Sequence, residues 1–161
     1  MECFTFDEFG TKAIKQIKLS PDSFIQIAMQ VAFYKLHGKP PVHYEAASLR
    51  RFRSARTECI RSTSCESMDF AMAMVFNNLN MNNEKKRELM VKAIQIHKRI
   101  ANKAAIGKGV DRHLYGLKMI AKSEGIELPE LYKDIGYTKS TYFTLTSSQV
   151  ILNYDYRKKS Y

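Results

Sequence analysis

The sequence predicts an α/β domain in which a mixed sheet is flanked by helices. Three observations lead to this: an apolar helix with clear start and stop signals, short segments that alternate as strands do, and two long helical stripes in the second half. The chain has 161 residues, 45% of them apolar and 26% charged, which suits one domain with a hydrophobic core rather than a disordered chain.

The first elements are a strand, a polar segment and a helix. Residues 3–9 alternate around Phe4 and Phe6, and a polar segment holding Lys12, Lys15 and Lys18 follows Gly10. Ser20 is a good N-cap, Pro21 suits the first helical position, and Gly38 ends the helix. We expect this helix to be buried against the sheet through the residues Phe24, Ile27, Ala28, Val31 and Ala32.

The middle of the chain is rich in arginine. Residues 42–46 form a short predicted strand, and a loop over residues 48–61 follows with Phe52 among the arginines Arg50, Arg51, Arg53, Arg56 and Arg61. Arginines around an aromatic ring fit nucleic-acid binding, but structural ion pairs and capped carbonyls are the commoner use. Composition alone leaves both interpretations open.

The second half predicts three helices and a strand. A capping box at Thr63 and Glu66 starts a helix rich in Met and Phe, whose methionines fit a core better than a metal site, and an Asn-rich turn over residues 77–83 ends it. Residues 84–105 form an amphipathic helix closed by Gly107. Residues 110–124 form another, with Val110, Leu114, Leu117, Ile120 and Ala121 facing inward, and residues 137–150 alternate as a strand.

Charge and cysteine content bear on the protein's partners and on its cellular compartment. The net charge of +10 fits a polyanionic partner or a solvated basic surface, and three lysines before a helix N-terminus could meet a phosphate or only water. Three cysteines without a CxxC motif, no apolar run near 18 residues and no signal-peptide pattern at Met1 predict an intracellular, reduced protein.

Five motifs give the chain a family resemblance. SPDSFIQIAMQ, YEAAS, RTECIRS, DRHLYGL and TLTSSQV occur in this order between Ser20 and Val150. In order and spacing they resemble the choline/carnitine acyltransferase family, over roughly residues 9–150. The resemblance implies a CoA-dependent acyltransferase fold, transfer of an acyl group between CoA and carnitine, and a mitochondrial or peroxisomal location. It divides the chain into a partial acyltransferase domain, residues 1–150, and a divergent tail, residues 151–161.

The resemblance assigns CoA contacts to several residues along the chain. Lys15 matches a lysine that binds the 3′-phosphate of CoA, and Lys12 stands beside Thr11, where the family usually has its first lysine. Further matches to CoA-binding positions are Asp22, Lys98 and Gln149. CoA and acyl-CoA would be substrates, and we expect neither a tightly bound cofactor nor a metal.

The resemblance also implies an acceptor site for carnitine. Tyr44, Thr57 and Arg112 match positions that bind the carnitine carboxylate, and Ser148 matches a serine that donates to the oxyanion. Arg112 lies at a helix start, where the helix dipole does not favour a cation. Choline-specific relatives carry Asn in its place and Val-Asp-Asn at residues 57–59. Ala46 departs from a serine that some members use.

One catalytic group is missing from the sequence. The family's general base is a histidine in a His-Ala dipeptide, and the histidines here (His37, His43, His97 and His113) are each followed by another residue. We therefore expect these four to be structural or exposed, and the chain to be part of the carboxyl-terminal half of an acyltransferase, inactive when isolated. Two alternatives stay open: a basic nucleic-acid-binding module, and an inactive relative that acts as a binding partner.

Overall fold

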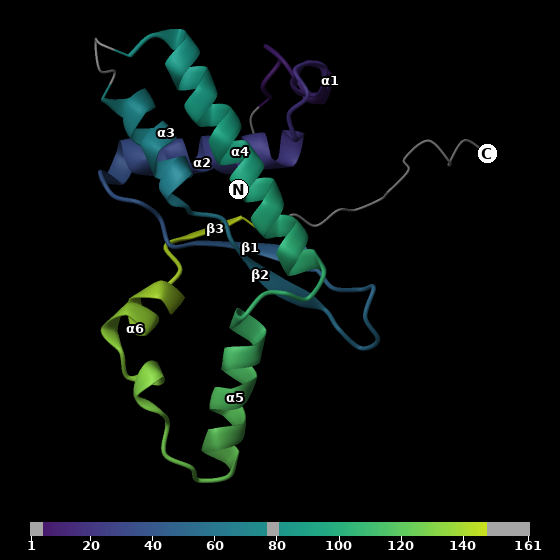
Figure 1. Cartoon of the computed structure of the whole chain (residues 1–161), viewed down its shortest axis with the longest axis vertical. Coiled ribbons are helices and arrows are strands. Elements are labelled where there is room, and N and C mark those ends of the chain that lie inside the picture. Colours follow the sequence, from purple (N-terminus) through teal and green to yellow (C-terminus); the bar gives the residue numbers. More distant parts are fainter. Residues whose placement is uncertain (1–4, 77–80, 148–161) are drawn as a thin grey trace, which may run out of the picture.

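A computed structural model describes residues 5–76 and 81–147 and contains a mixed α/β fold (Figure 1). The elements are α1 (Thr11–Gln16), α2 (Pro21–His37), β1 (His43–Ser48), β2 (Thr57–Arg61), α3 (Cys65–Val75), α4 (Asn83–Ala105), α5 (Asp111–Ser123), the 3-10 helix η1 (Glu130–Tyr132), α6 (Ile135–Thr141) and β3 (Leu145–Ser147).

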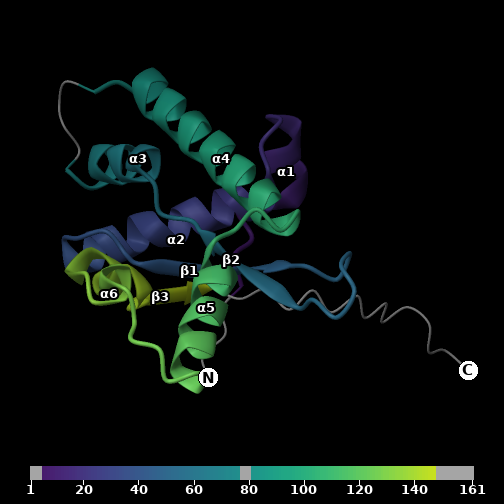
Figure 2. The same ribbon diagram turned by 60° about the horizontal axis from the view of Figure 1, so that its bottom comes forward.

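The three strands form one mixed sheet with β1 in the middle. β2 pairs antiparallel with β1 and β3 pairs parallel with it, in the order β2-β1-β3. The helices α2, α3 and α4 lie on one side of the sheet, whereas α5 and α6 lie on the other, as both views show (Figures 1 and 2). The predicted mixed sheet with flanking helices is confirmed for the described residues.

Helix α2 has the predicted limits, and Phe24, Ile27 and Val31 of its predicted inward face pack in the core, against α3 and α4 rather than against the sheet. The Ser23 amide donates to the Ser20 hydroxyl at 3.4 Å, and Gly38 ends the helix with a φ of 64°, a conformation that glycine adopts without strain. Ile27 packs in an apolar cluster with Phe70, Ala93 and Ile94 of α3 and α4. The expected inward positions Ala28 and Ala32 are exposed, and the residues buried beside Ile27 are Ser23, Gln26 and Gln30.

The remaining core lies between the sheet and α4. Ala47 of β1, Ile60 of β2 and Ala104 of α4 form a second buried cluster. The stripe predicted on the helix 84–105 is therefore confirmed, because this helix covers both clusters and its last turns reach the sheet.

Several predicted elements are wrong in type or position. Residues 5–9 of the first predicted strand are irregular, and part of the polar segment forms α1 instead of a loop. The capping box joins Ser64 and Ser67 rather than Thr63 and Glu66, because the Thr63 hydroxyl donates to the Pro41 carbonyl at 2.8 Å. The end of the predicted loop 48–61 is β2, and the predicted strand 137–150 begins as α6 and is extended only over Leu145–Ser147 in the described part.

Helix α5 contradicts the expectation of an inward apolar stripe. Val110, Leu117 and Ile120 have exposed fractions of 61%, 46% and 58%. The helix touches β2 near its start and then extends away from the sheet (Figure 2). Its amphipathic pattern is real, but η1 and α6 cover only part of it in the described part of the chain: the Tyr132 hydroxyl donates to the Leu114 carbonyl at 2.8 Å, and Lys118 lies over the rings of Tyr132 and Tyr137.

Candidate functional site

The sheet presents two chemically different faces. Pairing of Tyr44 with Arg61 and of Ser48 with Thr57 sets the register, and side chains alternate along each strand. We use "α5 face" for the side formed by Tyr44, Thr57, Cys59 and Arg61, and "helix-covered face" for the side formed by His43, Glu45, Ala47 and Ile60.

Three predicted substrate-binding residues meet on the α5 face. Nη2 of Arg112 donates to the Tyr44 hydroxyl at 3.0 Å and lies 3.4 Å from the Thr57 hydroxyl, while Nε donates to the Thr57 carbonyl at 3.2 Å. Arg112 forms no ion pair with an acidic side chain among the described residues. Its charge is therefore oriented by neutral oxygen atoms and left uncompensated at an exposed position.

The start of α5 is fixed by contacts with β2. Arg61 forms a two-pronged ion pair with Asp111 and also donates to the Ser140 carbonyl of α6. The hydrogen bonds to Asp111 raise the pKa of Arg61. The buried Glu58 carboxylate accepts from the Arg112 amide at 3.4 Å. Arg112 is thus held in place through its backbone as well as its side chain.

A cavity of about 630 Å³ opens beside the Arg112 guanidinium. It is walled by β1 and β2 on one side and by α5 and α6 on the other, and polar, aromatic and cationic side chains line it: Tyr44, Arg61, Arg112, Tyr115, Lys118 and Phe143. Cys59 also borders it, but burial, followed by the nearby Asp111, raises the pKa of this thiol to about 12, so it is a poor nucleophile.

Three of the predicted CoA-binding residues are exposed on helices. Lys12 and Lys15 lie one turn apart on α1, and Lys98 lies on α4. Asp22 in the first turn of α2 is half-buried, and burial, together with the negative charge of Glu45, raises its pKa. In the described part of the chain, no hydrogen bond or ion pair joins these four residues to Arg112, Tyr44 or Thr57. Ser148 and Gln149 lie outside the described residues.

The buried His97 of α4 connects this helix to α2 and to β1 through contacts that the sequence did not predict. His97 is 1% exposed, its Nδ1 lies 2.9 Å from the Ser23 hydroxyl, and its Nε2 lies 2.8 Å from the Glu45 carboxylate. The Ser62 hydroxyl donates to the same carboxylate oxygen at 2.7 Å. A signal existed in the sequence, because His97 interrupts the apolar stripe of its helix one turn after Ala93.

A second buried histidine joins α2 to β3. His43 is 2% exposed, with Nδ1 3.3 Å from Gln30 Nε2 and Nε2 2.5 Å from the Ser147 hydroxyl. Ser147 in turn donates to Gln26 Oε1 at 2.6 Å. Burial is the main reason that the pKa of His43 falls to about 4. His37 and His113 are exposed, whereas His43 and His97 are buried and hydrogen-bonded. That none of the four is catalytic stays a prediction.

The arginine-rich connection between β1 and β2 is mostly solvated. Arg61 is the one arginine of the five with an ion pair in the described part of the chain, and Arg50, Arg51, Arg53 and Arg56 are exposed. The expectation of structural ion pairs therefore holds for Arg61 and not for the loop.

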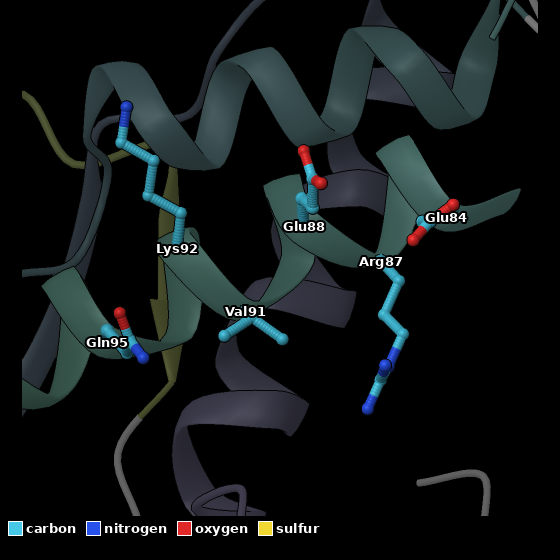
Figure 3. A pocket seen from close by; sticks show the side chains of 6 residues that line it. All are labelled: Glu84, Arg87, Glu88, Val91, Lys92 and Gln95. Atoms are coloured by element: carbon cyan, nitrogen blue, oxygen red, sulfur yellow. The ribbon is translucent and has the colours of Figure 1, made fainter. Parts of the chain in front are cut away.

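A further hollow of about 490 Å³ lies on α4 alone and contains none of the predicted site residues (Figure 3). Glu88 and Lys92 point to one side of the helix and Arg87 to the other, so their polar groups do not converge. Within residues 5–76 and 81–147, no group of three or more metal-ligating side chains occurs. In the same ranges no helix has the length and apolar character to cross a bilayer.

Comparisons with known proteins agree with the motifs. The chain is 43% identical over 145 residues to a carnitine O-acetyltransferase of Columba livia and 41% identical over 147 residues to a choline O-acetyltransferase of Sus scrofa. It is 40% identical over 137 residues to a peroxisomal carnitine O-octanoyltransferase of Homo sapiens. These alignments cover 90%, 91% and 85% of this chain but only 23%, 23% and 22% of the respective relatives.

Overall similarity does not separate carnitine from choline as the acceptor, because relatives of both kinds match about equally well. It does establish the family. The family profile described as Choline/Carnitine o-acyltransferase matches residues 1–156, nearly the whole sequence, and the chain therefore belongs to the choline/carnitine O-acyltransferase family.

Proposed function

We propose that this chain supplies the acceptor-binding part, and some of the CoA-binding part, of a carnitine O-acyltransferase. Such an enzyme transfers an acyl group reversibly between the sulfur of CoA and the hydroxyl of carnitine. The observation that carries the proposal is the exposed Arg112 guanidinium, which neutral oxygens orient but no carboxylate neutralises in the described part of the chain. A carboxylate ligand would complete this site.

The geometry favours carnitine over choline. Both ligands have a trimethylammonium group and a hydroxyl, whereas only carnitine has a carboxylate. The Tyr44 hydroxyl accepts from Arg112 and so keeps its own proton for a ligand oxygen, and the Thr57 hydroxyl lies beside the same guanidinium. A guanidinium flanked by two hydroxyls can bind a carboxylate through several charge-assisted hydrogen bonds. Choline offers nothing that would neutralise the charge.

The reaction needs groups that this chain supplies only in part. The acceptor hydroxyl must lose a proton as it attacks the thioester carbonyl, and the CoA thiolate leaves when the tetrahedral intermediate collapses. We assign Ser148 to the oxyanion and assign no general base, because none of the four histidines matches the family's catalytic position. We expect the isolated chain to show no turnover of acetyl-CoA with carnitine. Ordinary steady-state turnover by the purified chain would show that it contains the base.

The CoA side of the proposal rests on the resemblance and on exposed charge. Lys12 and Lys15 lie on α1 just before the start of α2, where a 3′-phosphate could meet two ammonium groups, and we assign Asp22, Lys98 and Gln149 to other parts of CoA. Lys15→Ala should weaken CoA binding while leaving 3′-dephospho-CoA binding unchanged. An equal loss for both ligands would remove Lys15 from the phosphate site.

The decisive experiment uses a hybrid enzyme in which this chain replaces the matching residues of a carnitine O-acetyltransferase. We expect Arg112→Asn to lower kcat/KM for carnitine about 10- to 150-fold, corresponding to a charged hydrogen bond worth roughly 1.5–3 kcal/mol. Use of choline should stay the same or improve slightly. Arg112→Lys is the matched control, since it keeps the charge but loses the fork, and should recover part of the loss.

Two results would overturn the acceptor assignment. One is an unmutated hybrid that prefers choline, and the other is an Arg112→Asn hybrid with unchanged carnitine kinetics. If the isolated chain also bound mixed-sequence DNA with an affinity that fell steeply with salt, the exposed arginines between β1 and β2 would favour the nucleic-acid interpretation instead.

A further inference from the structure

Four buried or half-buried side chains form a continuous line of hydrogen bonds from α2 across β1 to β3. Gln30 Nε2 lies 3.3 Å from His43 Nδ1, His43 Nε2 lies 2.5 Å from the Ser147 hydroxyl, and that hydroxyl donates to Gln26 Oε1 at 2.6 Å. Three of the four residues are at most 2% exposed. Water therefore has little access to these groups.

The direction of every bond in this line follows from the atoms at its ends. An amide oxygen only accepts, so the Ser147 hydroxyl must give its single proton to Gln26. The proton between His43 and Ser147 must then come from His43, which places it on Nε2 and leaves Nδ1 as an acceptor for the Gln30 amide. Only the neutral ring with its proton on Nε2 satisfies both contacts.

Gln30 shows that the line depends on this form of the ring. Its Oε1 is buried and has no hydrogen-bond partner among the described residues. Turning the amide over would bring that oxygen against the lone pair of Nδ1, so the amide keeps its NH₂ group toward the ring. A ring protonated on both nitrogens would reverse this preference, because Nδ1 would then need an acceptor.

The line passes through Ser147 of β3, which precedes the residues proposed to contact substrate, and returns to α2 at Gln26. Within the described residues, β3 covers Leu145–Ser147 and pairs with β1 at His43, Tyr44 and Glu45. The Ser147 hydroxyl adds side-chain contacts to both β1 and α2 beyond this backbone pairing. Ser148 and Gln149 follow directly in the sequence.

We propose that His43 is a positioning residue for acyl transfer: as the neutral ring protonated on Nε2, it holds Ser147, the residue that directly precedes Ser148 in the sequence. The functional meaning of Ser148 rests on the function proposed above. The link between His43 and β3 does not, and it can be measured without any ligand.

The surroundings of the ring determine how the link responds to pH. The ionisable groups that act on His43 are Glu45 of the same strand and His97 of α4, while α2 and β3 present the uncharged Gln30 and Ser147. The folded pKa of about 4 lies below the ordinary value of 6.5, mainly because of burial. The ring released from β3 therefore gains a proton below about pH 6.5, and acid favours the released form.

The test is hydrogen exchange of the β3 amides in this chain, together with ¹⁵N NMR of the histidine rings. We expect the His43 spectrum to show a neutral ring with its proton on Nε2 at pH 7. The opening equilibrium of β3, corrected for intrinsic exchange, should rise ~30-fold between pH 7.5 and pH 5, given a pKa of about 4 in place and 6.5 after release.

Matched variants separate positioning from bulk. His43→Gln can keep a donor near the Nε2 position, whereas His43→Asn reaches only the Nδ1 position. We expect His43→Asn and Ser147→Ala each to raise β3 exchange by at least tenfold. The exchange of His43→Gln should stay within about threefold of the unmutated chain and should lose the acid response.

Equal effects of His43→Gln and His43→Asn, a His43 proton on Nδ1, or pH-independent β3 exchange would overturn the proposal. The ring spectrum of the unmutated chain decides if a variant does not fold. If β3 exchange behaved as expected but carnitine and CoA did not bind, the proposed function would be refuted and the link between His43 and β3 would stand.

Discussion

Each face of the sheet holds an ionisable side chain with hydrogen bonds, but one face buries that side chain and the other leaves it exposed. On the helix-covered face, Glu45 is closed off by hydrogen bonds from His97 and Ser62, and all three are buried. On the α5 face, Arg112 is held by Tyr44 and Thr57 but remains exposed and without a counter-ion in the described part of the chain. Two consecutive residues of one strand, Tyr44 and Glu45, thus face the proposed carnitine site and the buried interior respectively.

This difference indicates where a substitution will be felt. A buried polar group whose partner is removed keeps its desolvation cost without compensation, whereas an exposed group is rehydrated. Changes on the helix-covered face should therefore reduce stability, and changes on the α5 face should reduce ligand binding while leaving stability nearly intact. Three substitutions test this contrast.

The largest effect should come from His97→Ala. It removes a partner from both Glu45 and Ser23 and leaves a cavity, so the free energy of unfolding should fall by roughly 3–5 kcal/mol. Urea titration followed by circular dichroism measures it. Lys85→Ala, which breaks an exposed pair with Glu88 on the same helix, should leave the urea midpoint unchanged. A His97→Ala chain as stable as the Lys85→Ala chain would contradict the assigned roles.

An intermediate effect should come from Gly109→Ala, at the junction of the two faces. A Cβ atom at this position would lie 2.3 Å from Glu58 Cγ. Glu58 is buried, and its carboxylate accepts a hydrogen bond from the Arg112 amide. We expect a loss of roughly 1–3 kcal/mol and a displaced start of α5, visible as altered amide signals around Arg112. Gly116→Ala on α5 meets open space and should stabilise the helix by up to about 1 kcal/mol. Losses of equal size at both glycines would show that the contact with Glu58 is irrelevant.

The smallest effect on stability should come from Arg112→Ala. The side chain is exposed and its partners can bond to water, so the free energy of unfolding should change by no more than about 0.5 kcal/mol in the same urea titration. Carnitine use by the hybrid enzyme should nevertheless fall at least as far as with Arg112→Asn. A strongly destabilised Arg112→Ala chain would mean that the α5 face is part of the scaffold.

Local signals in the sequence predicted the limits of α2 and α4 well. Ser20, Pro21 and Gly38 set the limits of α2, and apolar spacing set those of α4, because caps and periodicity act within a few residues. The strands were predicted less well, because their pairing joins residues that are distant in the sequence. β2 was missed because arginines dominate its surroundings. α6 was mistaken for a strand because the alternation of residues 142–145 was extended back over residues 137–141, which do not alternate.

The site was predictable to a different degree on each face. Tyr44, Thr57 and Arg112 were found through family motifs, and the structure brings them together although α5 is distant from β1 in the sequence. The buried contacts of His43 and His97 were not found. Polar residues inside an apolar pattern weaken the pattern itself, and their partners lie 52 residues away for His97 and 104 for His43.

The central place of β1 has a consequence for the order of folding. Its partner β2 follows after a short connection, so that hairpin can close as soon as both strands have left the ribosome. Its other partner, β3, comes about 80 residues later, which takes roughly 4–17 s of synthesis. Throughout that interval one edge of β1 has no strand to pair with and can accept a foreign one. Nascent chains should therefore aggregate through this edge of β1. Chaperones that bind extended segments should raise the yield of folded protein.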